Sequence, residues 1–149
     1  MAVSLPLTGG CACGAIRYEC VEPPMFVWKC HCRECQRSTG GGAAVNVVFS
    51  KPHVHFTKGA LKEHSSTGTS GQKTHRGFCA ECGSPLSARA DLIPDIRGIS
   101  AASLDDPGQI ELAAHIWTAS AQPWDELSAA LPHFETTPTE EDLQGLTTR

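Results

Sequence analysis

Seven of the eight cysteines fall into three short groups whose spacing is typical of metal ligands. The groups are CAC with Cys11 and Cys13, CHCREC with Cys30, Cys32 and Cys35, and CAEC with Cys79 and Cys82. Disulfide frameworks link distant segments, whereas a metal site gathers several donors on one turn. The pattern therefore favours metal binding over disulfide bonds.

The two outer groups, Cys11-x-Cys13 and Cys79-x-x-Cys82, supply four thiolates between them, enough for a closed tetrahedral zinc site. A glycine follows each pair and lets backbone amides turn toward the sulfurs. A closed site leaves no position for a substrate, so its expected role is structural. The alternative is that the two pairs are unrelated reduced thiols.

The central group supplies three further thiolates, from Cys30, Cys32 and Cys35. Three protein ligands with one exchangeable position are typical of catalytic zinc. Three thiolates make the metal a weaker Lewis acid than three neutral histidines do, which disfavours hydrolysis and favours binding of a thiol. We expect a substrate thiolate to bind there, with Lys29 or Arg33 offsetting the negative charge. The alternative for these two cations is that they are solvated surface charges.

Cys20 could supply a fourth ligand to the central group and close it. In AIRYEC, however, Ile16, Tyr18 and Cys20 alternate onto one face of a strand. This favours a buried, inert thiol.

The histidines are assigned no chemistry. His53 and His55 share a strand face opposite Val54 and Phe56 and are expected to face solvent, while His31 should point away from the metal. His115 also receives no role. The sequence shows no Ser/His/Asp grouping, phosphate loop or nucleotide fingerprint.

Short alternating runs predict strands at 15–20, 44–49, 53–56 and 110–117. A short helical turn is expected after Cys32, ended by the glycines at 40–42, and a helix is expected over 124–131, ended by Pro132. Residues 65–74 are expected to form a flexible loop between two strands, and the polar tail after Pro138 is expected to fray. These elements predict a mainly β fold.

A chain of 149 residues suits one domain, 1–149, with its core at about 5–138 and a polar tail at 139–149. The net charge of −4 argues against a nucleic-acid partner. The sequence has no secretory signal and no apolar run long enough to cross a membrane, which predicts a cytoplasmic protein. It gives no indication of an oligomeric state.

The order CxC, CxCxxC, CxxC resembles that of the glutathione-dependent formaldehyde-activating enzyme family, whose domain is shared with centromere protein V. GGCACGAIRYE is similar to the family's opening strand, CHCRECQRSTG to its central motif and RGFCAECGSPL to its second half-site. HIWTASAQPWDELSAALPHF is similar to its closing segment. The resemblance covers about residues 5–138. The chain departs from the family pattern at Cys20 and in the long 65–74 loop.

The resemblance implies an Mss-four-like zinc fold of small coiled antiparallel sheets with one short C-terminal helix. It implies formation and cleavage of S-(hydroxymethyl)glutathione from glutathione and formaldehyde, a carbon–sulfur lyase reaction. It implies two zinc ions per chain, a structural one held by Cys11, Cys13, Cys79 and Cys82 and a catalytic one held by Cys30, Cys32 and Cys35. The alternative is a non-catalytic zinc module that binds another protein, as the centromere-protein resemblance allows.

Overall fold

The computed structural model describes residues 2–68 and 71–147, and these form two β-sheets with two short α-helices. The strands of the smaller sheet are β1 (Leu7–Gly10), β2 (Arg17–Cys20) and β5 (Val54–Lys58), in the order β1-β2-β5. Those of the larger sheet are β3 (Phe26–Cys30), β4 (Ala44–Ser50), β6 (Lys62–Thr67), β7 (Lys73–Phe78), β8 (Pro85–Ala90), β9 (Ile96–Ser100), β10 (Ala114–Ile116) and β11 (His133–Phe134). The mainly β fold predicted from the sequence is confirmed.

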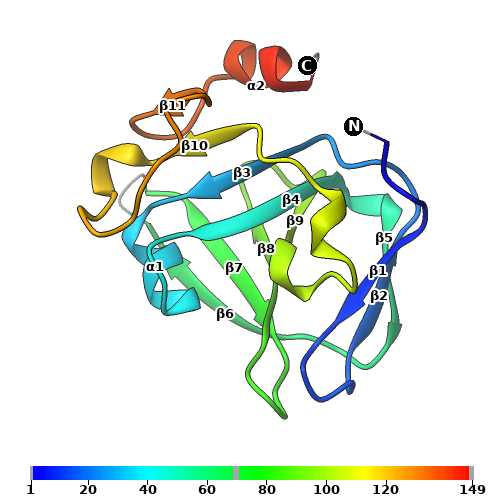
Figure 1. The fold of residues 1–149 in the computed structure, drawn as a ribbon. Coiled ribbons are helices and arrows are strands. Elements are labelled where there is room, and N and C mark those ends of the chain that lie inside the picture. Colours follow the sequence, from blue (N-terminus) through cyan, green and yellow to red (C-terminus); the bar gives the residue numbers. More distant parts are fainter. Residues whose placement is uncertain (1, 69–70, 148–149) are drawn as a thin grey trace.

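The larger sheet has the order β11-β10-β3-β4-β9-β8-β7-β6. Its pairs are antiparallel except at one end, where β10 lies parallel to both β3 and β11. Figure 1 shows the smaller sheet at one side of the larger one. The helices are α1 (Arg33–Thr39) and α2 (Glu140–Thr147), and short 3-10 turns span Lys51–His53, Ala101–Ser103, Pro107–Gln109 and Thr118–Ser120.

One face of the larger sheet packs against the smaller sheet to form the main core. Because side chains alternate along a strand, every second residue of β4 and β9 points to this face, including the fully buried Val47 and Ile99. From β2, Tyr18 and Cys20 enter the same cluster, as the alternation in AIRYEC predicts. The opposite, outer face of the larger sheet does not contribute to this core.

Helix α1 begins directly after Cys32 and ends where the sequence predicts. The Cys32 side chain accepts a hydrogen bond from the backbone N–H of Cys35 and so caps the first turn. Gly40 ends the helix in the left-handed conformation, at φ 74°, which costs glycine no steric strain. The expected helical turn after Cys32 is confirmed.

The prediction of a helix over 124–131 is wrong, because these residues form turns and irregular structure. The segment's large aromatic residue has little to pack against, since Trp124 is 68% exposed. The backbone N–H of Ser128 donates to Nε2 of His115 instead of to a carbonyl in a helical ladder. A tertiary contact therefore overrides the local helical preference.

The C-terminal helix lies in the tail that was expected to fray, so that expectation is also wrong. The Thr139 hydroxyl accepts from the backbone N–H of Asp142, whose carboxylate accepts from the Thr139 N–H. This reciprocal cap fixes the start of α2. Leu146 is buried and packs in a second cluster with Phe26 and Val48, so the helix covers one end of the larger sheet's outer face (Figure 1).

Two other segments differ from expectation. The 65–74 region contributes three residues to β6 and two to β7, so the connecting loop is shorter than predicted; residues 69–70 lie outside the described part of the chain. Only Ala114–Ile116 of the expected 110–117 strand pairs in the sheet, although Ile110 and Leu112 still pack against the core. Among the described residues, no helix is long and apolar enough to span a membrane.

Candidate metal centres and the adjoining cleft

Two turns, each closed by a glycine, carry the outer cysteine pairs. In one, the N–H of Gly14 donates to the carbonyl of Cys11 at 3.2 Å; in the other, the N–H of Gly83 donates to the carbonyl of Cys79 at 2.8 Å. Both glycines have φ 78°, a conformation that L-residues rarely adopt. The glycine after each pair therefore closes the turn, as expected from the sequence.

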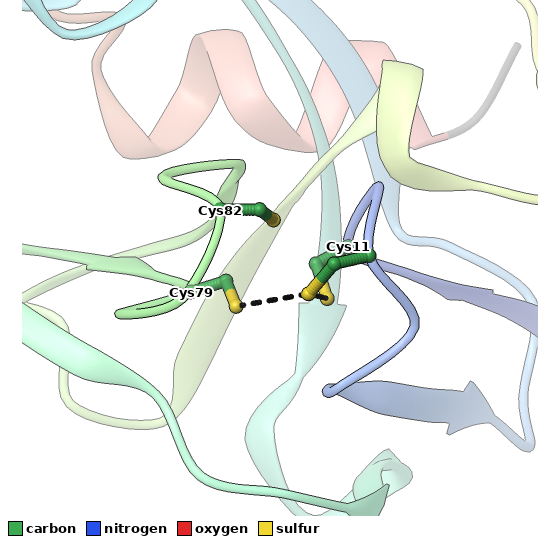
Figure 2. A group of neighbouring side chains, drawn as sticks. Cys11, Cys79 and Cys82 are labelled. Carbon is green, nitrogen blue, oxygen red and sulfur yellow. Dashed lines mark hydrogen bonds between the residues drawn. The ribbon is translucent and has the colours of Figure 1, made fainter.

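The two turns face each other and bring four sulfurs together (Figure 2). The sulfur of Cys13 lies 3.6 Å from that of Cys11 and 3.8 Å from that of Cys79, and with Cys82 the four sulfurs all lie within 4.8 Å of one another. Zinc–sulfur bonds of about 2.3 Å in a tetrahedron place the sulfurs about 3.8 Å apart. The four cysteines can therefore hold one metal ion, and their spacing fits zinc.

Hydrogen bonds around this centre favour the thiolate form that metals require. The backbone N–H of Ile16 donates to the sulfur of Cys11 at 3.2 Å. Hydrogen bonds from the side chain and backbone of Ser84 lower the pKa of Cys82 to about 5. At Cys13 the backbone N–H of Ala15 lowers the pKa, but the neighbouring cysteine sulfurs outweigh it and raise this pKa to about 11. All four thiols can therefore be deprotonated together only when a cation binds among them.

The second cysteine group spans the junction between β3 and α1. Cys30 is the last residue of β3, Cys32 caps α1 and Cys35 lies in its first turn. This strand-to-helix turn brings the three sulfurs within 4.8 Å of one another. Cys30 and Cys35 are buried and Cys32 is half-buried, so these residues can also hold a metal ion.

A cation that sequence reasoning missed contacts this group. Nη2 of Arg76, in β7, lies 3.7 Å from the sulfur of Cys35, and its Nη1 donates to the Ser66 hydroxyl at 3.3 Å. Hydrogen bonds from the Cys30 and Cys32 thiols, followed by the charge of Arg76, lower the pKa of Cys35 to about 3. The contact joins residues 41 positions apart, although the position of Arg76 in RGFC, just before the second half-site, is a signal that could have pointed to it.

Lys29 and Arg33 are bound by other partners. The Lys29 ammonium donates to Oδ1 of Asp125 at 3.1 Å. Since Cys30 follows directly in the same strand, Lys29 points to the opposite face. Arg33 is exposed and donates to the side-chain oxygen of Gln36.

Behind the second cysteine group, two buried histidines form a hydrogen-bonded chain. Nε2 of His115 accepts from the backbone N–H of Ser128 at 3.2 Å, so a neutral His115 carries its proton on Nδ1 and donates to Nε2 of His31 at 2.9 Å. Nδ1 of His31 then carries a proton and lies 3.3 Å from Oδ2 of Asp125, although the two atoms do not meet hydrogen-bond geometry. His31 thus contacts His115 and Asp125 and is absent from the ligand cluster, as expected.

Gln36 of α1 connects the CHCREC segment to the 118–128 segment by hydrogen bonds. Its side-chain amide donates to the carbonyls of His31 and Ser120 at 2.7 and 3.0 Å. Asp125 of this segment packs directly on Gly42, where a Cβ would lie 2.5 Å from its carboxylate oxygen. Only glycine fits there without displacing Asp125.

A cleft with about 950 Å³ of empty space, including solvent at its mouth, lies on the outer face of the larger sheet. Cys30, Cys32, Cys35 and Arg76 line it, and so do alternate residues of β4, β9, β8 and β7, because these point to the face opposite the core. The three-cysteine group is therefore open to this cleft.

Cys20 lies outside both ligand clusters. It is fully buried in the main core, and burial raises its pKa to about 12. The predicted burial of Cys20 is confirmed. His55 of β5 is exposed, and His53, the last residue of the preceding 3-10 turn, is half-buried, while Val54 and Phe56 pack on the core.

The fold brings together a Ser/His/Asp row that the sequence does not show as a motif. The Ser65 hydroxyl lies 2.6 Å from Nδ1 of His75, and Nε2 of His75 lies 2.7 Å from Oδ1 of Asp91. Strand pairing creates this row from residues up to 26 positions apart, which explains why no local motif announces it. The three residues do not line the cleft described above.

Comparison with known proteins identifies a matching family, a relative and a solved structure of similar fold. The family model described as "Glutathione-dependent formaldehyde-activating enzyme" matches residues 6–120. A protein of Halomonas elongata named "Putative glutathione-dependent formaldehyde-activating enzyme" is 31% identical over 90 residues, 54% of either chain, so this chain spans about half the length of that relative. The crystal structure of a Rhodobacter sphaeroides protein has a similar fold, with a TM-score of 0.54 and 23% identity, covering 70% of this chain and 97% of that one.

Proposed function

Because the chain belongs to the family of glutathione-dependent formaldehyde-activating enzymes, we propose that it is a zinc-dependent carbon–sulfur lyase that forms and cleaves the adduct of a thiol and an aldehyde. Glutathione and formaldehyde are the first pair of substrates to test. The observation that carries the proposal is the difference between the two cysteine groups. Four sulfurs close one centre, whereas three sulfurs line an open cleft at the other.

The four-cysteine group is assigned a structural role. It joins the turn after β1 to the turn after β7, which are 66 residues apart between Cys13 and Cys79. A metal ion that joins two distant turns stabilises a fold whose short strands bury little apolar surface.

The three-cysteine group is assigned the reaction. Zinc held by Cys30, Cys32 and Cys35 would supply a thiophilic centre with one exchangeable position, at which a thiol loses its proton. The substrate sulfur then forms a bond to the aldehyde carbon as the C=O π bond breaks, and the oxygen takes up the proton that the thiol released. The reverse reaction breaks the same C–S bond.

Arg76 is the residue best placed to balance the charge of this step. Three thiolates and a substrate thiolate outweigh the charge of a divalent cation, and the Arg76 guanidinium contacts the Cys35 sulfur from the cleft side. Lys29 and Arg33, the cations expected from the sequence, have partners of their own in Asp125 and Gln36. We therefore assign charge compensation to Arg76 in their place.

All eight cysteines are unpaired, so the activity requires a reducing compartment, for which we propose the cytoplasm. The alternative function is a non-catalytic zinc module that binds another protein. Such a module would bind no substrate thiol at the three-cysteine group. The two functions differ in whether the protein accelerates adduct exchange.

The test is exchange NMR on ¹³C-labelled formaldehyde mixed with glutathione, since the adduct also forms unaided and only acceleration counts. Zinc-loaded protein should accelerate exchange, Cys35→Ser should abolish the acceleration, and Cys20→Ala serves as the matched cysteine control outside both centres. Equal exchange rates with and without the wild-type protein, at two bound zinc ions per chain, would favour the interaction module instead.

A further inference from the structure

The cleft beside the three-cysteine group carries little charge for a glutathione site. The charged residues among its lining are Glu34, Arg76 and Arg89. Arg89 is already bound by both carboxylate oxygens of Glu63, at 2.8 and 2.9 Å. Arg76 is thus the cation in this lining that has no carboxylate partner among the described salt bridges.

The walls of the cleft are mainly apolar. They are built by Trp28, Val48, Ile93, Ile96, Ile116 and Trp117. Ile93 lies in the turn between β8 and β9 and is 41% exposed, so the apolar surface extends to the mouth. Apolar surface facing an open cleft favours an apolar ligand, because water is released when the two meet.

Trp117 adds backbone strain at the same place. It has φ 57° and is the single non-glycine residue with positive φ in the described part of the chain. A bulky residue in this conformation is costly, and such strain gathers at functional sites. The Trp117 indole N–H donates to Thr137 at 3.2 Å, and the residue packs on the cluster of Cys30, Cys35 and Ile116. This packing keeps the strained residue's aromatic side chain beside the three-cysteine group.

Formaldehyde has one carbon and cannot contact walls of this extent. Resting on the proposed function, we propose that the cleft selects thiol–aldehyde adducts that carry an apolar alkyl or aryl substituent, which packs between the two tryptophans and Ile93. The substituent belongs to the aldehyde or to the thiol, and the experiment below separates these two sources.

The first test measures binding without chemistry. S-hexylglutathione and S-methylglutathione are thioethers, so neither can release a thiol proton, and they differ only in alkyl length. Tryptophan fluorescence reports binding, and Trp124→Phe removes the one exposed tryptophan, leaving Trp28 and Trp117 in the cleft. We expect the hexyl compound to bind about tenfold more tightly or better, since burying two methylene groups suffices for that ratio.

The matched variants are Ile93→Asp and Leu92→Asp. These neighbours share one turn, but Ile93 lines the cleft, whereas Leu92 is 77% exposed and does not. Ile93→Asp should remove most of the preference for the hexyl compound and Leu92→Asp should keep it. Equal affinity for the two compounds, or an equal loss in both variants, overturns the proposal.

The second test compares adduct exchange in three mixtures: glutathione with formaldehyde, glutathione with hexanal, and benzyl mercaptan with formaldehyde. A preference for the second mixture that Ile93→Asp removes places the substituent on the aldehyde, and the same result for the third places it on the thiol. A preference for the first mixture that Ile93→Asp leaves unchanged overturns the proposal. Tighter binding of the hexyl compound without acceleration of any mixture supports the cleft assignment and contradicts the lyase function instead.

Discussion

Nη2 of Arg76 lies 3.7 Å from the sulfur of Cys35. Arg76 and Cys79 belong to one continuous segment, β7 and the turn that follows it, three residues apart. The four-cysteine centre therefore fixes the end of the strand that presents Arg76 to the three-cysteine group. The structural centre and the cleft are connected through this short segment.

Replacing Arg76 with alanine should lower the rate of adduct exchange by about 10- to 100-fold, because the charge that develops on sulfur loses its nearby cation. The same change should shift the pH profile of the rate to higher pH, since removing a positive charge raises the pKa of a bound substrate thiol. Arg76→Lys should restore part of the rate. The measurement is the pH dependence of exchange at saturating zinc.

Arg37→Ala is the control for Arg76, because Arg37 is an exposed arginine of α1. It should leave both the rate and the pH profile unchanged. If Arg76→Ala behaved like Arg37→Ala while both proteins held two zinc ions, Arg76 would have no part in the reaction.

The two cysteine groups should respond differently to serine substitution. Cys79→Ser should lower the free energy of unfolding by about 3 kcal/mol or more, because it opens the centre that joins distant turns. Cys35→Ser should cost less stability but abolish activity. Urea unfolding monitored by circular dichroism, together with zinc release to a colorimetric chelator, measures both effects, and the reverse order of stability loss would contradict the assignment of roles.

His115 should make stability depend on pH. Burial, reinforced by the charges of His31, His133 and Lys29, lowers its pKa from 6.5 to about 4, with Asp125 acting in the opposite direction. Below pH 6.5 the unfolded chain therefore binds a proton that the folded chain does not. The stabilisation is complete above pH 6.5 and is lost as the pH falls toward 4, which amounts to about 2 kcal/mol between pH 6.5 and 5.

Urea unfolding of the wild type, His115→Gln and His55→Gln at pH 7 and pH 5 checks this dependence. His115→Gln should show a smaller loss of stability on acidification than the wild type. His55→Gln changes an exposed histidine and should match the wild type. Equal losses in all three proteins would contradict the role of His115.

The Lys29–Asp125 pair should matter more than a surface pair. Its side chains are 23% and 19% exposed, and Asp125 also faces the buried Nδ1 of His31. Asp125→Ala should cost about 2 kcal/mol of stability, since it leaves Lys29 partly buried without its partner. Asp105→Ala breaks the exposed pair with Arg17, at 38% and 47% exposure, and should cost about 1 kcal/mol or less. Denaturation midpoints of the two variants decide the order.

The cysteine groups and the strand faces could be predicted because their signals are local. The spacing within each group fixes which sulfurs meet on one turn, and alternation in AIRYEC fixes that Tyr18 and Cys20 are buried. Gly40 likewise marks the end of α1 by its backbone preference.

The features that were missed depend on contacts between distant segments. The 124–131 stretch has helical residues, but His115 takes the Ser128 N–H and no neighbour covers Trp124. The tail forms α2 because Leu146 meets a cluster built from β3, β4 and β10. Arg76 meets Cys35, and Ser65 meets His75, only after the strands have paired.

The measurement that tests the central claim most directly is visible spectroscopy of the cobalt-substituted protein titrated with glutathione. Cobalt reports the number of thiolate ligands, so a thiol binding at the three-cysteine group should intensify the sulfur-to-cobalt absorption in the wild type and in Cys20→Ala. Cys35→Ser, which keeps the four-cysteine centre, should give no such increase. A wild-type spectrum that glutathione and other thiols leave unchanged would show that the group has no position for a substrate thiol and would contradict the proposed reaction.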